Sequence, residues 1–147
     1  MRHSRTRILP YTPEQLFALV GEMERYPEFI PWIGGLRTWN RRRDGEGVET
    51  LDAEVKVRFA IISEKFSTWV RLDRPGLTID VGLISGPFRK LENHWRFKSH
   101  PEGAELTFDI DFEVSSRLIE GLLNANLHKA VARLVRCFED RARALYG

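Results

Sequence analysis

Hydrophobic and polar residues alternate with a period of two through most of residues 36–114. The clearest case is residues 104–114, in which acidic residues and one threonine separate Ala104, Leu106, Phe108, Ile110, Phe112 and Val114. Because successive side chains of a strand point to opposite faces, this alternation predicts strands with one apolar face. Strands are predicted at residues 3–10, 36–43, 48–57, 60–73, 77–84, 88–98 and 104–114. The short, turn-like connections between the last six favour an antiparallel sheet.

The period changes to three and four residues after the first predicted strand. Thr12 suits a helix N-cap, Pro13 suits the first helical position, and Gln15 stands where a capping box places its return partner. A short helix is therefore predicted to begin at Thr12. Gly21 marks its expected end.

A long amphipathic helix is predicted from Ser115 or Ser116 to about Leu145, because apolar residues recur there at steps of mostly three or four. A helix of about 29 residues spans roughly 43 Å, and strands of about 10–12 residues span roughly 33–40 Å. The matched lengths predict an α+β fold, in which a curved antiparallel sheet of about seven strands wraps around the C-terminal helix. Short helices follow the first strand, and residues 1–147 form a single domain.

The predicted interior is not uniformly apolar. Glu64, Thr68 and Asn93 occupy inward positions of their strands, and the first half of the long helix is interrupted by Gly121, Asn124, Asn126 and His128. A buried polar group without a partner costs about 1–3 kcal/mol, unless another polar group, water or a ligand contacts it. The pattern leaves two interpretations open: a solid core, or a sheet and helix that enclose a cavity.

Residues 26–32 read YPEFIPW, with aromatic and apolar side chains between two prolines. We refer to these residues as the lip segment. The prolines favour an extended, stiff segment at the rim of the sheet. Phe29, Ile30 and Trp32 are predicted either to seal the core or to line the mouth of a cavity.

Composition and charge narrow the function classes. The chain has 147 residues, 42% of them hydrophobic and 30% charged, with a net charge of +2. This balance argues against a protein built mainly to neutralise nucleic-acid phosphates, and no DNA partner is expected. The single cysteine, Cys137, is interpreted as core. Neither a transmembrane run nor a secretory leader is evident, so we expect a cytoplasmic protein, or one at the cytoplasmic face of a membrane.

The search for catalytic chemistry gives no positive sign. The four histidines form no metal-ligand pattern, and the sequence has no Gly-rich phosphate loop and no GxSxG motif. Glu64 is the one carboxyl group predicted to face the interior, and His128 is interpreted as an ordinary helix histidine. We therefore expect no enzymatic activity and no required cofactor. The basic run Arg41–Arg43 is interpreted as a solvated hairpin end or, alternatively, as a contact for RNA or anionic lipid.

Two strings resemble a known family. YPEFIPW (26–32) and GPFRKLENHWRF (86–97) are similar to the coenzyme Q-binding proteins of the START-like, polyketide-cyclase-like superfamily, which has the helix-grip fold. The resemblance implies a domain that holds a lipophilic molecule, ubiquinone above all, between sheet and long helix, in support of respiration. It also implies an alternative partner, the ribosome, because one bacterial branch is described as ribosome-associating toxins that interfere with subunit joining.

The leading hypothesis is non-enzymatic binding, chaperoning or transfer of ubiquinone or a similar isoprenoid lipid, with possible peripheral contact at the inner face of a membrane. Phe29, Pro31 and Trp32 are predicted to form the lip of the cavity. The side chains predicted to line it are Phe66, Val81, Trp95, Phe108, Leu118, Leu122 and Leu123. The alternatives are ribosome association and a cyclase- or aromatase-like enzyme that uses Glu64 or His128 in a polar pocket.

Overall fold

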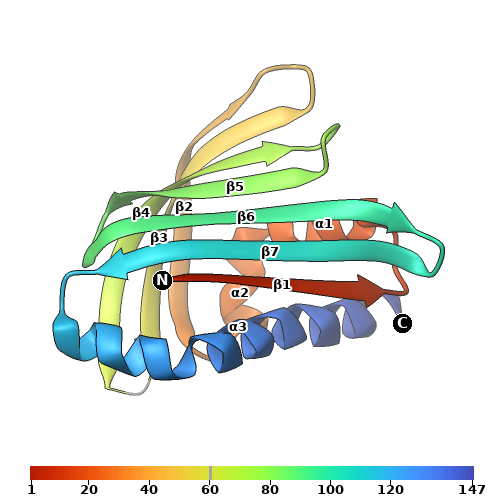
Figure 1. The fold of residues 1–147 in the computed structure, drawn as a ribbon. Coiled ribbons are helices and arrows are strands. Elements are labelled where there is room, and N and C mark those ends of the chain that lie inside the picture. Colours follow the sequence, from red (N-terminus) through yellow and green to blue (C-terminus); the bar gives the residue numbers. More distant parts are fainter. Residues whose placement is uncertain (60) are drawn as a thin grey trace.

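The computed structural model describes residues 1–59 and 61–147, and within them it forms one seven-stranded antiparallel sheet (Figure 1). The strand order is β1-β7-β6-β5-β4-β3-β2, so the strands from β2 to β7 form a meander and β1 pairs with the last of them. The strands are β1 (Arg2–Leu9), β2 (Ile33–Arg43), β3 (Val48–Phe59), β4 (Ile62–Asp73), β5 (Thr78–Ser85), β6 (Phe88–His100) and β7 (Gly103–Val114). The predicted fold class is confirmed. Ala60, the predicted start of the fourth strand, lies outside the described residues.

The helices lie on one side of this sheet. They are α1 (Pro13–Gly21), a 3-10 turn η1 (Met23–Arg25), α2 (Tyr26–Phe29) and α3 (Arg117–Tyr146). The capping box is confirmed: the Gln15 backbone N–H donates to Thr12 Oγ1 over 3.1 Å, and the Thr12 N–H donates to Gln15 Oε1 over 3.0 Å. Ser116 is the N-cap of α3, since its hydroxyl accepts from the Ile119 N–H. Within the described residues, no helix is long and apolar enough to cross a membrane.

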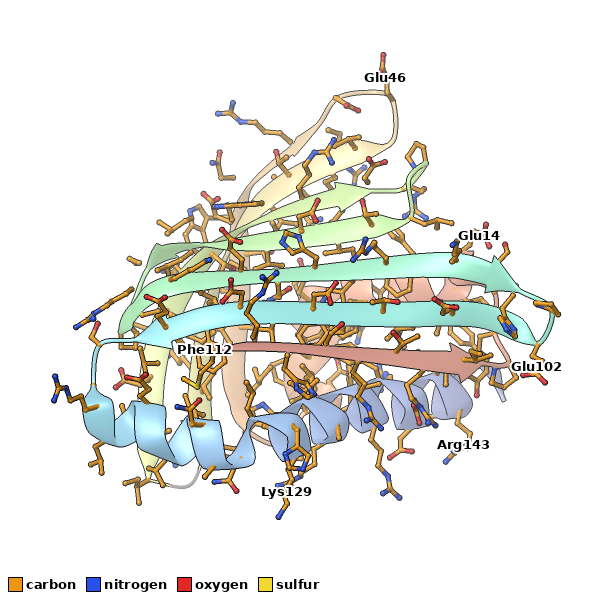
Figure 2. All side chains as sticks on the ribbon, viewed as in Figure 1. Glu14, Glu46, Glu102, Phe112, Lys129 and Arg143 are labelled. Carbon is orange, nitrogen blue, oxygen red and sulfur yellow. The ribbon has the colours of Figure 1, made fainter. Side chains whose placement is uncertain are left out.

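The two halves of α3 pack differently. The second half buries Val131, Val135, Phe138 and Ala142, whereas no residue of the first half is fully buried. Figure 1 shows α3 running along β1, and Figure 2 shows Lys129 and Arg143 extending from α3 away from the sheet. The polar interruptions of the helix pattern thus mark the half that leaves the core. Because the first half of α3 is only partly buried, there is space between it and the sheet.

The prediction of an extended lip segment is wrong. Residues Tyr26–Phe29 form the short helix α2, and the Ile30 N–H donates to the Tyr26 carbonyl over 2.9 Å. Pro27 is compatible with this turn because the first N–H groups of a helix have no intrahelical partner to lose. The Tyr26 hydroxyl donates to the Val20 carbonyl, and burial, with a smaller contribution from Glu24, raises the pKa of Tyr26 far above its ordinary value. The hydroxyl therefore keeps its proton and holds α2 against α1.

Candidate ligand-binding site

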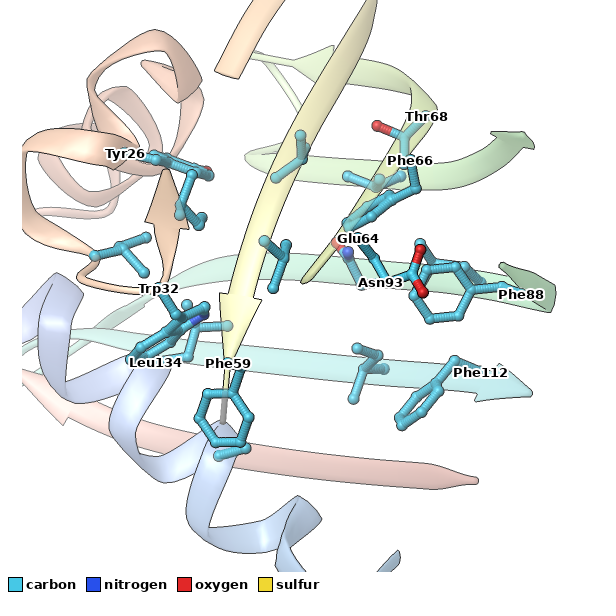
Figure 3. Close-up of a pocket in the computed structure, with 18 of the residues that line it drawn as sticks. Tyr26, Trp32, Phe59, Glu64, Phe66, Thr68, Phe88, Asn93, Phe112 and Leu134 are labelled. Carbon is cyan, nitrogen blue, oxygen red and sulfur yellow. The ribbon is translucent and has the colours of Figure 1, made fainter. Parts of the chain in front are cut away.

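A cavity of about 330 Å³ lies between the inner face of the sheet and α3, and it is partly open to the outside (Figure 3). Small-molecule sites are typically about 300–1,000 Å³, so its size suits a ligand. Its walls come from β2 to β7, from α3 and from the lip segment, and most of them are apolar. The α3 side chains that line it include Ile119, Leu123, Leu127, Ala130, Val131, Leu134 and Phe138.

Two aromatic groups contribute to the wall, and they belong to different parts of the core. Trp95 packs against Phe108 at 4.4 Å and against Phe138 at 5.1 Å between ring centroids, within the main core. Phe88 packs against Phe66 at 5.3 Å and Phe112 at 6.4 Å, within a separate cluster. All of these residues line the cavity. The hollow is therefore lined by members of both clusters, and the interpretation as a solid core is wrong for this region.

Beside Tyr26, three polar side chains of the sheet line this apolar space: Glu64 and Thr68 from β4, and Asn93 from β6. Figure 3 shows all three on the cavity side of the sheet. Thr68 is only 3% exposed. Within the described residues, Asn93 Oδ1 is buried and accepts no hydrogen bond. Such an unpaired acceptor costs about 1–3 kcal/mol in the empty protein.

Six of the side chains predicted for the ligand site line the cavity, and four do not. Those that line it are Trp32, Phe66, Val81, Trp95, Phe108 and Leu123. Pro31 is exposed, and Phe29, Leu118 and Leu122 also lie outside the lining. The structure shows only where these residues lie. Their role in ligand binding stays a prediction.

Phe29 is displaced because α2 is helical. The helical turn directs its ring to the second half of α3, where it packs against Phe138 at 5.3 Å, with the Arg141 guanidinium 5.2 Å from the ring centroid. Arg141 also pairs with Glu28 over 3.6 Å. Trp32 follows this turn, and it contacts Phe59 at 6.1 Å and the Arg133 guanidinium at 5.6 Å. The lip segment thus fixes α3 with one aromatic ring and lines the cavity with another.

Leu118 and Leu122 are displaced by the phase of α3. Ile119 and Leu123 face the cavity, and residues one position earlier are rotated by about 100°. Leu118 is accordingly 69% exposed and Leu122 37% exposed. The apolar stripe of α3 in the sequence is wider than the surface that the sheet covers. Periodicity alone therefore could not tell Leu118 and Leu122, which are exposed, from Ile119 and Leu123, which line the cavity.

The predicted ligand-site residues also left out several lining residues, including Phe59, Phe88 and Phe112. Phe112 was recoverable, because the period of two places it on the same face as Phe108. Phe88 sits at a register shift between β6 and β7, which breaks the alternation on which such an assignment depends.

The remaining candidates for chemistry are dispersed. His128 is exposed, and His94 lies within 2.7 Å of Asp80 on the opposite face of the sheet. The described residues hold no group of three or more side chains able to bind a metal ion. Cys137 packs against the core, and burial raises the pKa of its thiol, which disfavours the nucleophilic thiolate.

The curved antiparallel sheet, the long C-terminal helix and the apolar cavity between them define a START-like protein. A START superfamily structure from Mycobacterium smegmatis has the same fold, with a TM-score of 0.82 at 23% identity over 98% of each chain. The family model for polyketide cyclase / dehydrase and lipid transport matches residues 9–139. The chain belongs to this family. The superfamily predicted from the two strings is therefore confirmed.

Individual relatives point in two directions. The ribosome association toxin RatA of Pseudomonas aeruginosa is 34% identical over 97% of this chain and 96% of its own length. The mitochondrial coenzyme Q-binding protein COQ10 homolog B of Xenopus laevis is 25% identical over 100% of this chain and 60% of its own length. An 18 kDa protein of Caulobacter crescentus, solved in solution, is 48% identical over 100% of this chain and 99% of its own, with a TM-score of 0.86. Membership of the coenzyme Q-binding family stays a prediction.

Proposed function

We propose that this protein binds one lipophilic molecule in the cavity and carries it without changing it chemically. The cavity is the observation that supports this function most strongly. Removing about 300 Å² of apolar ligand surface from water contributes roughly 7 kcal/mol before the cost of ordering the ligand. Ubiquinone or a similar isoprenoid quinone is the expected ligand class. Most of the described lining residues are apolar, which supports binding of a lipophilic molecule.

Replacing Trp32 with aspartate tests this function. The change removes an indole from the cavity wall and adds a carboxylate that Arg133 can hold at the surface. We expect the affinity for a decyl-substituted ubiquinone, measured by equilibrium dialysis, to fall at least about tenfold. Trp69→Asp is the matched control, because Trp69 is 43% exposed and Gly82 lies beneath its ring on the outer face. Equal affinities of the wild type and Trp32→Asp would count against the cavity as the binding site.

Association with the ribosome is the second candidate function. The relatives named for ribosome association match this chain at higher identity, and over more of their own length, than the coenzyme Q-binding relative does. The similarity to these relatives therefore favours ribosome association over ubiquinone binding. We place the protein in the cytoplasm on this proposal, with a ribosome as its macromolecular partner.

The described part of the surface offers a basic cluster for this role. Lys56 and Lys65 stand directly opposite each other in the β3–β4 register, on the outer face, and Arg58 follows on the same face. Like charges placed opposite each other destabilise a sheet, and an anionic partner would add to the relief that the nearby Glu54 carboxylate, which pairs with Arg37, already gives. The run Arg41–Arg43 is less suitable, since Arg41 pairs with Glu24 and Glu49, and Arg43 also lies within 3.6 Å of Glu49.

The double variant Lys56→Glu/Lys65→Glu tests the basic cluster. We expect the wild type to co-sediment with purified ribosomal subunits at low salt. The variant should remain in the supernatant. The slope of binding against salt concentration should fall by about two, one for each phosphate contact removed. Lys129→Glu/Arg143→Glu, on the side of α3 that faces away from the sheet, is the control. Failure of the wild type to co-sediment, or equal loss in both variants, would contradict a contact through this cluster.

A further inference from the structure

Asn93 is surrounded by groups that cannot satisfy its side-chain oxygen. Its register partners are Val81 on β5 and Ile110 on β7, and both present apolar side chains to the cavity. Leu91 precedes it on the same face of β6. Asn93 Oδ1 remains buried without a donor among residues 1–59 and 61–147. An amide oxygen accepts hydrogen bonds and cannot donate them, so only a donor from a ligand can complete this site, and the amide has to turn to present its shielded oxygen to that donor.

The nearby polar groups give Asn93 Oδ1 no hydrogen bond, although the Thr68 hydroxyl and the Asn93 amide N–H2 are donors that a ligand can meet. The carboxyl oxygens of Glu64 and the hydroxyl oxygen of Thr68 also face the cavity (Figure 3). The Tyr26 hydroxyl, which also lines it, already donates to the Val20 carbonyl. A ligand head group that only accepts hydrogen bonds can pair with the Asn93 amide N–H2 or the Thr68 hydroxyl, but it leaves Asn93 Oδ1 unpaired. A head group with an O–H would pair with it.

We infer that the cavity selects an apolar molecule that carries a hydroxyl group, which donates its hydrogen bond to Asn93 Oδ1. The inference rests on the proposed binding function and specifies its ligand. For a quinone and its reduced quinol, which share one carbon skeleton, it assigns the tighter binding to the quinol. Quinone carbonyl oxygens can only accept, whereas the two quinol hydroxyls donate. One hydrogen bond to an otherwise unpaired buried acceptor corresponds to about a tenfold difference in affinity.

Equilibrium dialysis of the full chain against decyl-substituted ubiquinol and ubiquinone, under argon, measures this preference. We expect the quinol to bind about tenfold more tightly than the quinone. In Asn93→Leu the roughly tenfold preference for the quinol should disappear, so that quinol and quinone bind with equal affinity. The melting temperature of the empty variant should equal or exceed that of the wild type, since an unpaired acceptor has been removed. Ile110→Val, next to Asn93 but without a polar atom, should change both affinities by the same factor.

A second ligand pair separates aromatic from aliphatic hydroxyls. 1-Dodecanol and its methyl ether differ only in the donor. An Asn93-dependent gain for the quinol alone assigns a phenolic hydroxyl, and a gain for dodecanol alone assigns an aliphatic one. Equal affinities within both pairs, or a preference that survives in Asn93→Leu, would overturn the inference while leaving the cavity a lipid site. Binding of none of the four probes would remove the proposed function itself.

Discussion

Replacing Ile110 with tryptophan is expected to lower the lipid bound per chain by at least about tenfold while the protein stays folded. Ile110 lines the cavity from the middle of β7, between Phe108 and Phe112. A larger side chain there fills space that a ligand would occupy. Overpacking usually destabilises a core by about 1–3 kcal/mol, but here the added ring has an existing void to enter. Extraction with organic solvent, followed by quantification of lipid against protein, gives the occupancy.

Ile84→Trp is the matched control for this variant. Ile84 lies on β5 and is 51% exposed, so the same substitution adds the same ring outside the cavity. Its lipid occupancy should equal that of the wild type. Equal occupancy in the wild type and Ile110→Trp, with the variant folded, would show that lipid is held elsewhere.

Phe138→Ala is expected to have the largest effect on stability. Phe138 is 1% exposed, and its ring contacts those of Tyr26, Phe29 and Trp95 at 5.2, 5.3 and 5.1 Å. Phe138 joins α3 to α2 and to the sheet. Its removal leaves an empty space that can close only if all three elements shift. A loss of about 3–5 kcal/mol in the free energy of unfolding is expected. The melting temperature should fall by roughly 10 °C.

Leu118→Ala supplies the comparison on the same helix. Leu118 is 69% exposed, and the free energy of unfolding should change by no more than about 0.5 kcal/mol. Denaturant unfolding of both variants measures the difference. A loss below about 1 kcal/mol for Phe138→Ala would mean that the second half of α3 is not the anchored half.

The sequence predicted the strands and their faces because a period of two is a local property. Val70, Val81 and Phe108 are assigned to the inner face by their neighbours in sequence alone, and the structure buries all three. The polar positions Glu64 and Asn93 were assigned in the same way and line the cavity. A polar residue in a well-defined apolar period therefore indicated that the interior is not simply filled.

The helical turn of the lip segment and the face that the first half of α3 turns to the cavity could not be predicted from local rules. Pro27 fits an extended segment and the first turn of a helix equally well, and the packing of Tyr26 and Phe29 against Phe138 decides between them. Leu122 is exposed and Leu123 lines the cavity, and this difference depends on where the sheet ends. Both are tertiary properties.

The fold and the cavity do not by themselves choose between the two proposed roles. Members of one fold perform different functions through the groups that they place in a site. The cavity and the cluster of Lys56, Arg58 and Lys65 lie on opposite faces of the sheet, since the cluster alternates with cavity-lining residues along β3 and β4. A ligand and a ribosome could therefore be bound at the same time. Ile110→Trp and Lys56→Glu/Lys65→Glu separate the two roles, because each changes only one face.

The central claim is that the space between sheet and α3 holds a lipophilic molecule. The most direct measurement is mass spectrometry of the organic extract of the purified protein, with recovered lipid expressed per chain. The account predicts about one apolar, hydroxyl-bearing molecule per chain, lost in Ile110→Trp and retained in Ile84→Trp. A wild-type protein that is purified without lipid, and that takes up none of the quinone, quinol or alcohol probes, would contradict it.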